Sequence, residues 1–298
     1  MASNEVEVII TAREESIGAF SVRRTLPSVR RRMVGPFTFL DHMGPVSGSG
    51  SGLDVLPHPH IGLATLTYLF EGEVVHRDTL GNTQRIRPRE VNWMVAGRGI
   101  AHSERSPFES KRMHGIQAWI ALPEEHEEDP PEFTHLDEPD LPLLTDTGVD
   151  AQLLSGSAYG LTNRARSFSP HFYVAARVED GARIALPQEH QERAIYVATG
   201  AVTFANERYT AGQLIVAAPQ SEAVLTSDGP SQVMLLGGEP LGRRFMWWNF
   251  VSSRKERIEQ AKEDWRSGRI ALPPDDDREF VPLPPDLRPR KPEPEPMS

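Results

Sequence analysis

The order of apolar and polar residues predicts a chain built mainly of short β-strands. Residues 61–70 are rich in β-branched and aromatic side chains and end at Glu71-Gly72-Glu73, which predicts a strand followed by a turn. Further strands are predicted at 74–78, 84–87 and 91–95, separated by a Gly-Asn turn and a Pro turn. Short antiparallel strands at this spacing favour a closed barrel or jelly roll over an α/β sheet.

An internal repeat predicts that the barrel occurs twice. Residues 56–60 resemble residues 186–190, and residues 68–72 resemble residues 196–200. In the second copy Gln188 stands where the first copy has a histidine, and no His or Glu pair two residues apart follows the second Pro-turn strand. The second barrel is therefore expected to keep the fold without a metal site, and to serve for stability, cover or partner binding.

Changes in composition divide the chain. We expect a first barrel over residues 1–130, a linker over 131–144 and a second barrel over 145–270. The acidic, Pro-containing stretch 124–140 is interpreted as solvated linker rather than as a second metal site, because crowded like charges repel one another and resist packing. Residues 271–298, dominated by Pro and charged residues, predict a disordered or loosely docked tail.

One amphipathic helix is expected near the end of the second barrel. Ile258, Ala261 and Trp265 recur at helical spacing, and Ser253 with Glu256 has the pattern of a capping box. The predicted helix runs from about residue 253 to 267. The aromatic run that precedes it, 241–250, is attributed to packing across a barrel surface, with a protein-partner patch as the alternative.

Composition narrows the classes of partner. The chain has 298 residues and a formal net charge of -10, which disfavours nonspecific binding to nucleic acid or to an anionic membrane. Arg30-Arg31-Arg32 is the one dense basic run, and a solvated surface explains it better than a nucleic-acid site. There is no cysteine, no signal-peptide pattern and no apolar run near the ~20 residues of a membrane helix, so we expect a cytoplasmic protein.

Two pairs of metal-ligand residues stand out, His58 with His60 and His102 with Glu104. Side chains two residues apart on a strand point to the same face, so two neighbouring strands could bring three imidazoles and one carboxylate together. Such a set suits Fe, Mn, Ni, Cu or Zn and leaves coordination positions open. By the same parity the two histidines would share a face with Leu66, Tyr68 and Phe70. A lone histidine is usually a surface or core residue, but two such pairs favour one divalent metal ion.

The residues HPHIGLATLTYLFEGEVVHRD, followed by NWMVAGRGIAHSE, resemble the motifs of the pirin family of the cupin superfamily. The resemblance implies two cupin barrels in tandem, an all-β fold. It also implies that the family's metal ligands correspond to His58, His60, His102 and Glu104, with Fe(II) the ion first expected. Many cupins carry a further Glu on the ligand strand, and its place here is taken by Ala64. Glu104 is then the one carboxylate expected at the metal.

Three alternatives exist for the role of the metal site, and the resemblance implies the first two. In the first, the protein is a quercetin 2,3-dioxygenase that opens the central ring of a flavonol, with Glu104 accepting the substrate's hydroxyl proton and Leu66, Tyr68 and Phe70 lining an aromatic slot. In the second, it is a metal-containing regulator that binds a protein partner, such as a transcription complex or a metabolic enzyme. In the third, the metal only braces the barrel. The sequence leaves all three open.

Overall fold

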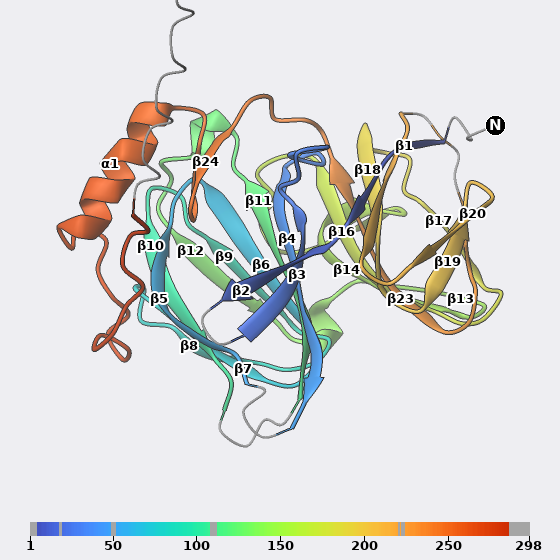
Figure 1. Ribbon diagram of the computed structural model, residues 1–298, viewed down its shortest axis with the longest axis horizontal. Helices are drawn as coiled ribbons and strands as arrows, with labels where there is room; N and C mark the ends of the chain where they lie inside the picture. Colours follow the sequence, from blue (N-terminus) through green and yellow to red (C-terminus); the bar gives the residue numbers. More distant parts are fainter. Residues whose placement is uncertain are drawn as a thin grey trace, which may run out of the picture.

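The computed structural model describes residues 5–17, 20–48, 52–107, 112–219, 221 and 224–285, and it shows two β-barrels side by side (Figure 1). One α-helix among these residues, α1 (Lys255–Arg266), lies at the outer side of the first barrel. The predicted all-β architecture of two tandem barrels with a C-terminal helix is confirmed. No helix in the described ranges has the length and apolar character needed to cross a bilayer.

The first barrel is made of two sheets. The larger one has the order β12 (Glu132–Leu136), β9 (Val91–Val95), β6 (Leu63–Glu71), β11 (Arg112–Ala121), β4 (Phe37–Ser47), β3 (Phe20–Leu26), β2 (Arg13–Ile17). The smaller one has the order β5 (Asp54–His60), β10 (Ile100–Arg105), β7 (Val74–Asp78), β8 (Thr83–Ile86). Neighbouring strands in both sheets are antiparallel, although most of them are not consecutive in the chain.

The second barrel repeats this plan. Its larger sheet has the order β1 (Val6–Thr11), β21 (Gln213–Ala217), β18 (Glu192–Thr199), β23 (Ser231–Gly238), β16 (His171–Val178), β14 (Val149–Ala158), β13 (Leu143–Asp146), with β15 (Leu161–Thr162) paired to β14. Its smaller sheet has the order β17 (Arg183–Ala185), β22 (Val224–Ser227), β19 (Ala201–Phe204), β20 (Glu207–Thr210). Two single-turn 3-10 helices, Glu124–His126 and Glu138–Asp140, lie in the connection between the barrels.

The large sheets of the two barrels pack against each other. Tyr68 and Phe70 from the first barrel belong to the same buried cluster as Tyr173 and Tyr196 from the second. Side chains on the other face of the first barrel's large sheet, such as Thr67, point into that barrel instead. One face of this large sheet therefore lies toward the interior of the first barrel, and the other lies toward the second barrel. Side chains on the interior face are the ones that can reach the metal-ligand pairs.

The chain ends are exchanged between the barrels. Strand β1 pairs with β21 of the second barrel, whereas the hairpin of β24 (Phe245–Trp247) and β25 (Phe250–Ser252) lies with α1 on the first, where Ile61 bridges to Phe250. The predicted boundaries are wrong at these points and at β12, which pairs with β9 although it falls in the expected linker. Pairing between distant strands depends on long-range packing, and local composition does not encode it.

The helix begins later than predicted, and the capping box does not form. The N-cap residue is Arg254, without a side-chain capping bond. The Ser253 hydroxyl and backbone N–H instead donate to the buried carboxylate of Glu127, at 3.1 and 2.7 Å. Glu127 lies in the stretch expected to be solvated linker, so that interpretation fails for this residue, which is 3% exposed. Ile258, Ala261 and Trp265 are buried, which matches the predicted apolar face.

The segment after the helix runs along the ligand strands of the first barrel. The Val281 N–H donates to the Pro57 carbonyl at 2.8 Å, and the Trp265 indole N–H donates to the Val281 carbonyl at 3.0 Å. Arg105 donates to both carboxylate oxygens of Asp276, at 2.8 and 2.9 Å. Within the expected tail, the segment 271–285 thus lies along the barrel. Residues 286–298 lie outside the described residues.

Candidate metal centre

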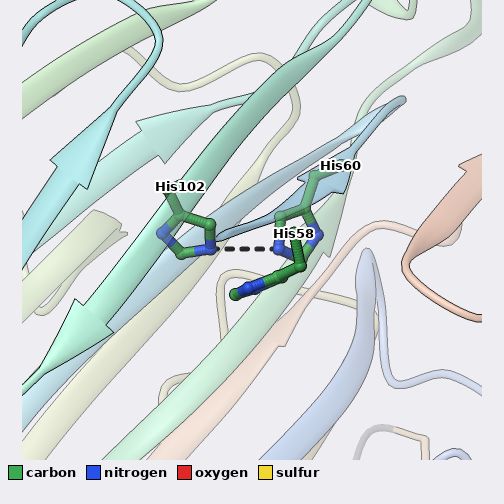
Figure 2. A group of neighbouring side chains, drawn as sticks. All are labelled: His58, His60 and His102. Carbon is green, nitrogen blue, oxygen red and sulfur yellow. Dashed lines mark hydrogen bonds between the residues drawn. The ribbon is translucent and has the colours of Figure 1, made fainter. Parts of the chain in front are cut away.

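Strand pairing in the small sheet brings the two ligand pairs together. Strands β5 and β10 are antiparallel, and His102 lies directly opposite His58 in the register. The alternation of side chains along β5 places His58 and His60 on one face. Figure 2 shows the three imidazoles of His58, His60 and His102 turned toward one another.

The spacing of the three imidazoles fits a single metal ion. One ring nitrogen from each of His58, His60 and His102 lies within 4.8 Å of the others. The Nε2 atoms of His60 and His102 are 3.1 Å apart (Figure 2). Two nitrogens bound to one ion at about 2.0–2.1 Å, with an angle of about 95–100° between them, are separated by this distance. The donor set and its spacing therefore match those of an imidazole-rich divalent site.

The three imidazoles are buried and held neutral, which is the form that binds metals. Burial lowers the pKa of His58 to about 4, despite the opposing effect of its hydrogen bond to the Leu56 carbonyl. Burial, with the neighbouring imidazoles adding to it, holds the pKa values of His60 and His102 well below the ordinary value. His58 Nδ1–H donates to the Leu56 carbonyl at 2.8 Å, so its Nε2 is left with a free lone pair.

Glu104 lies beside this cluster rather than in it. One of its carboxylate oxygens belongs to a second group of ligand atoms, with His76 and His102. The carboxylate accepts hydrogen bonds from the Thr67 hydroxyl at 2.9 Å and from Gln117 Nε2 at 3.1 Å. Burial raises its pKa, against the opposing effects of His76 and Thr67. The four predicted residues thus lie around His102, which is shared by both groups.

His76 and Asp78 are neighbours of the site that the sequence reasoning missed. His76 Nε2 lies 3.1 Å from Asp78 Oδ2, and His76 Nδ1 lies 3.2 Å from His102 Nδ1. Burial alone would raise the pKa of Asp78, but hydrogen bonds from His76 and Asn82 outweigh it and hold that pKa below its ordinary value. The signal was present, because His76 and Asp78 have the same two-residue spacing as the ligand pairs.

Leu66, Tyr68 and Phe70 do not face the three imidazoles, and the predicted aromatic slot is wrong. Side chains would alternate without interruption from 58 to 70 only on one continuous strand, but the chain breaks at Gly62 and enters a different sheet. Gly62 has φ +67°, and a Cβ there would lie 2.0 Å from the Val251 carbonyl oxygen. The three side chains are in the core between the barrels. Phe70 also lines a cavity of about 760 Å³ at that interface.

Comparison with known proteins identifies the chain. The pirin family model matches residues 19–120, and the model of the pirin C-terminal cupin domain matches residues 173–271. A pirin-like protein of Caulobacter vibrioides is 51% identical over 94% of this chain and 99% of its own length. The chain belongs to the pirin family. The predicted resemblance is confirmed, and the two barrels are cupin domains.

Two further relatives of this pirin have names that refer to an activity. A Pseudomonas aeruginosa protein named provisionally as a quercetin 2,3-dioxygenase is 40% identical over 87% of this chain and 83% of its own length. The crystal structure of a quercetin 2,3-dioxygenase from Acinetobacter baumannii superposes with a TM-score of 0.86. That protein is 35% identical, and the match covers 94% of this pirin and 96% of the other chain.

Other histidines of this pirin have different surroundings. His190 corresponds to His60 in the internal repeat. Its Nε2 lies 2.9 Å from the Ser157 carbonyl oxygen. A third group of ligand atoms, from Glu90, His135 and Asp137, lies toward the surface of the first barrel. There His135 is 2.8 Å from the Asn92 side chain and 3.2 Å from Asp137. The two buried groups that share His102 remain the candidate centre.

Proposed function

We propose that this pirin is a metal-dependent dioxygenase that opens the ring of a flavonol such as quercetin. The observation that carries the proposal is the 3.1 Å approach of two buried, neutral imidazole nitrogens, with His58 beside them. The quercetin 2,3-dioxygenase names of two similar proteins support the choice of substrate. Fe(II) is the ion we expect, and Mn, Ni, Cu or Zn would also suit the donors.

In this proposal the ligands are His58, His60, His102 and Glu104. The bound ion would supply a Lewis-acidic position for the substrate oxygen and for O2. Glu104 would accept the proton of the substrate hydroxyl, since its carboxylate has a raised pKa and is kept in place by Thr67 and Gln117. These two neighbours orient the carboxylate, so the proton would be held at a defined position in the barrel.

The aromatic contact for the substrate is proposed on the interior face of the large sheet. Trp119 lies edge-to-face with His60, with ring centroids 5.1 Å apart, and it stacks on Phe39 at 3.9 Å. Both rings point into the barrel that holds the imidazoles, unlike Tyr68 and Phe70. Trp119 and Phe39 therefore replace the predicted slot residues as the proposed wall of the site.

The test is aerobic turnover of quercetin by protein loaded anaerobically with Fe(II). We expect loss of the flavonol absorbance with stoichiometric O2 uptake and release of carbon monoxide. His102→Ala should abolish turnover and metal retention, whereas the control His135→Ala should preserve both. Metal-loaded protein that is inert toward quercetin and a panel of other enolisable aromatics would overturn the enzymatic proposal and favour the regulator.

A further inference from the structure

A chain of hydrogen bonds links the metal centre to a side chain outside it. The chain runs from Asp78 through His76 to His102, and all three side chains are at most 1% exposed. Strand pairing sets this arrangement. Strand β10 lies between β5 and β7, so His102 has His58 opposite it on one side and Asp78 on the other. His102 is therefore the point at which the ligand strand and the His76–Asp78 strand meet.

The first link fixes the proton on His76. Asp78 Oδ1 accepts the backbone N–H groups of Leu80 and Asn82, at 2.9 and 3.1 Å, and the Asn82 amide donates to both carboxylate oxygens. A carboxylate that accepts this many donors is ionised and acts only as an acceptor. The contact of 3.1 Å between Asp78 Oδ2 and His76 Nε2 must then be made by an N–H of His76.

The second link fixes the proton on His102. With its proton on Nε2, where Asp78 accepts it, His76 offers the lone pair of Nδ1 to its other neighbour. This atom lies 3.2 Å from His102 Nδ1, and one proton between the two nitrogens makes a hydrogen bond, whereas none would leave two lone pairs in contact. His102 Nδ1–H is therefore the donor. Its Nε2 is left bare, so in the metal-free protein the proton of its 3.1 Å contact with His60 Nε2 is carried by His60.

The ring of His76 is also held in orientation by packing. Phe133 from β12 stacks on it, with centroids 4.5 Å apart and an interplanar angle of 16°. A ring packed in this way cannot turn freely to exchange its two nitrogens. The stacking thus preserves the direction of both hydrogen bonds. It also gives β12, which falls in the expected linker, a role beside the metal centre.

We infer that His76 and Asp78 are positioning residues that keep His102 in the tautomer with Nδ1 protonated and Nε2 free to bind a metal. The inference rests on the assignment of His102 as a ligand in the proposed function, and it adds two residues to the four that the family motif covers. A hydrogen bond from the remote nitrogen of a ligating imidazole makes that ligand more basic, and its loss typically weakens metal affinity about 10–100-fold.

The test measures the tautomer and the metal affinity of the full-length protein. In metal-free protein labelled with ¹⁵N-histidine, we expect NMR to show a proton on His102 Nδ1 and none on Nε2. His76→Leu should mix the two tautomers and weaken Co(II) binding about 10–100-fold. His76→Gln should retain the wild-type pattern and affinity, because the Gln amide can accept from His102 and donate to Asp78. The control His135→Leu should change neither.

Two results would overturn the inference. One is a proton on His102 Nε2 in the wild-type protein. The other is a His76→Leu variant with unchanged tautomer and unchanged Co(II) affinity. If His76→Leu does not fold, the wild-type spectrum and His76→Gln still decide, since a tautomer change in the Gln variant would contradict the predicted rescue. Neither measurement uses a flavonol or O2, so failure of the dioxygenase proposal would leave these results readable.

Discussion

The Tyr68 hydroxyl donates a hydrogen bond to Gln152 Oε1 across the boundary between the barrels, at 2.9 Å. Burial raises the pKa of Tyr68 to about 12, so the phenol remains a donor at neutral pH. The side chain that parity placed in the aromatic slot thus joins the two domains. It stands on the face of the large sheet opposite Thr67, which contacts Glu104.

Tyr68→Phe should therefore reduce stability and leave the metal centre intact. Removal of the hydroxyl leaves a buried amide oxygen without its donor, at a cost of about 1–3 kcal/mol in the free energy of unfolding. Urea unfolding measures this cost, and Co(II) affinity should be unchanged. Tyr209→Phe is the matched control, because its hydroxyl donates to the exposed Glu207 at 3.3 Å. A selective loss of metal or flavonol binding in Tyr68→Phe would contradict the interface role.

Thr67→Val should impair the centre. The substitution keeps the shape of the side chain but removes the hydroxyl that contacts Glu104 at 2.9 Å. With one of its two described donors lost, the carboxylate becomes poorly oriented, and we expect metal affinity or flavonol turnover to fall about 10–100-fold. Thr65→Val, a buried substitution two residues earlier on the same strand, is the control. Equal metal affinity and flavonol turnover in the two variants would contradict a role for Thr67 at the site.

Glu127→Gln should loosen the C-terminal hairpin and helix. The buried carboxylate accepts from Ser252 Oγ at 2.8 Å, and Arg244 Nε lies 3.2 Å from it. Hydrogen bonds to a charged group are worth about 1.5–3 kcal/mol, so unfolding free energy should fall by that order. Hydrogen exchange should also quicken in α1 more than in the second barrel. The exposed neighbour offers a control, Glu125→Gln, which should match the wild type.

Acid should destabilise the protein partly through His171. Burial lowers the pKa of His171 to about 4, from about 6.5 in an unfolded chain. Between these values the unfolded state binds more protons, so the stabilisation is complete above pH about 6.5 and is lost as pH falls toward 4, by about 3 kcal/mol. His171→Gln should flatten the dependence of unfolding free energy on pH in this window. A variant with the wild-type slope would show that His171 titrates normally in the folded protein.

Much of the site could be predicted from the sequence because its ligands come from local patterns. Strand alternation places His58 and His60 on one face, and the turn-rich region between them and His102 allows the two strands to pair. The slot prediction failed at Gly62, where a positive φ and the approach of Val251 end one strand and begin another. The alternation of residue types in the sequence continues through Gly62, although the backbone there passes from one sheet to another.

The missed features depend on contacts between distant segments. The role of His76 becomes apparent only when β7 lies beside β10. The role of Phe133 becomes apparent only when β12 joins the same barrel. Strand β1 shows the same limit, since its alternation predicts a strand but not its partner β21, about two hundred residues later in the chain. The order of apolar and polar residues and the family motifs predicted the class of fold, whereas the assignment of each strand to a barrel depends on packing.

The exchange of chain ends has a consequence for synthesis on the ribosome. The first strand emerges early, yet its partner β21 is translated about two hundred residues later, so the nascent strand must remain unpaired while the barrel around the metal ligands is made. That barrel in turn waits for the last hairpin and helix to cover it. Each half completes its fold only with a segment from the other half of the chain, so a gene split between the two cupin domains should yield fragments that are stable only when co-expressed.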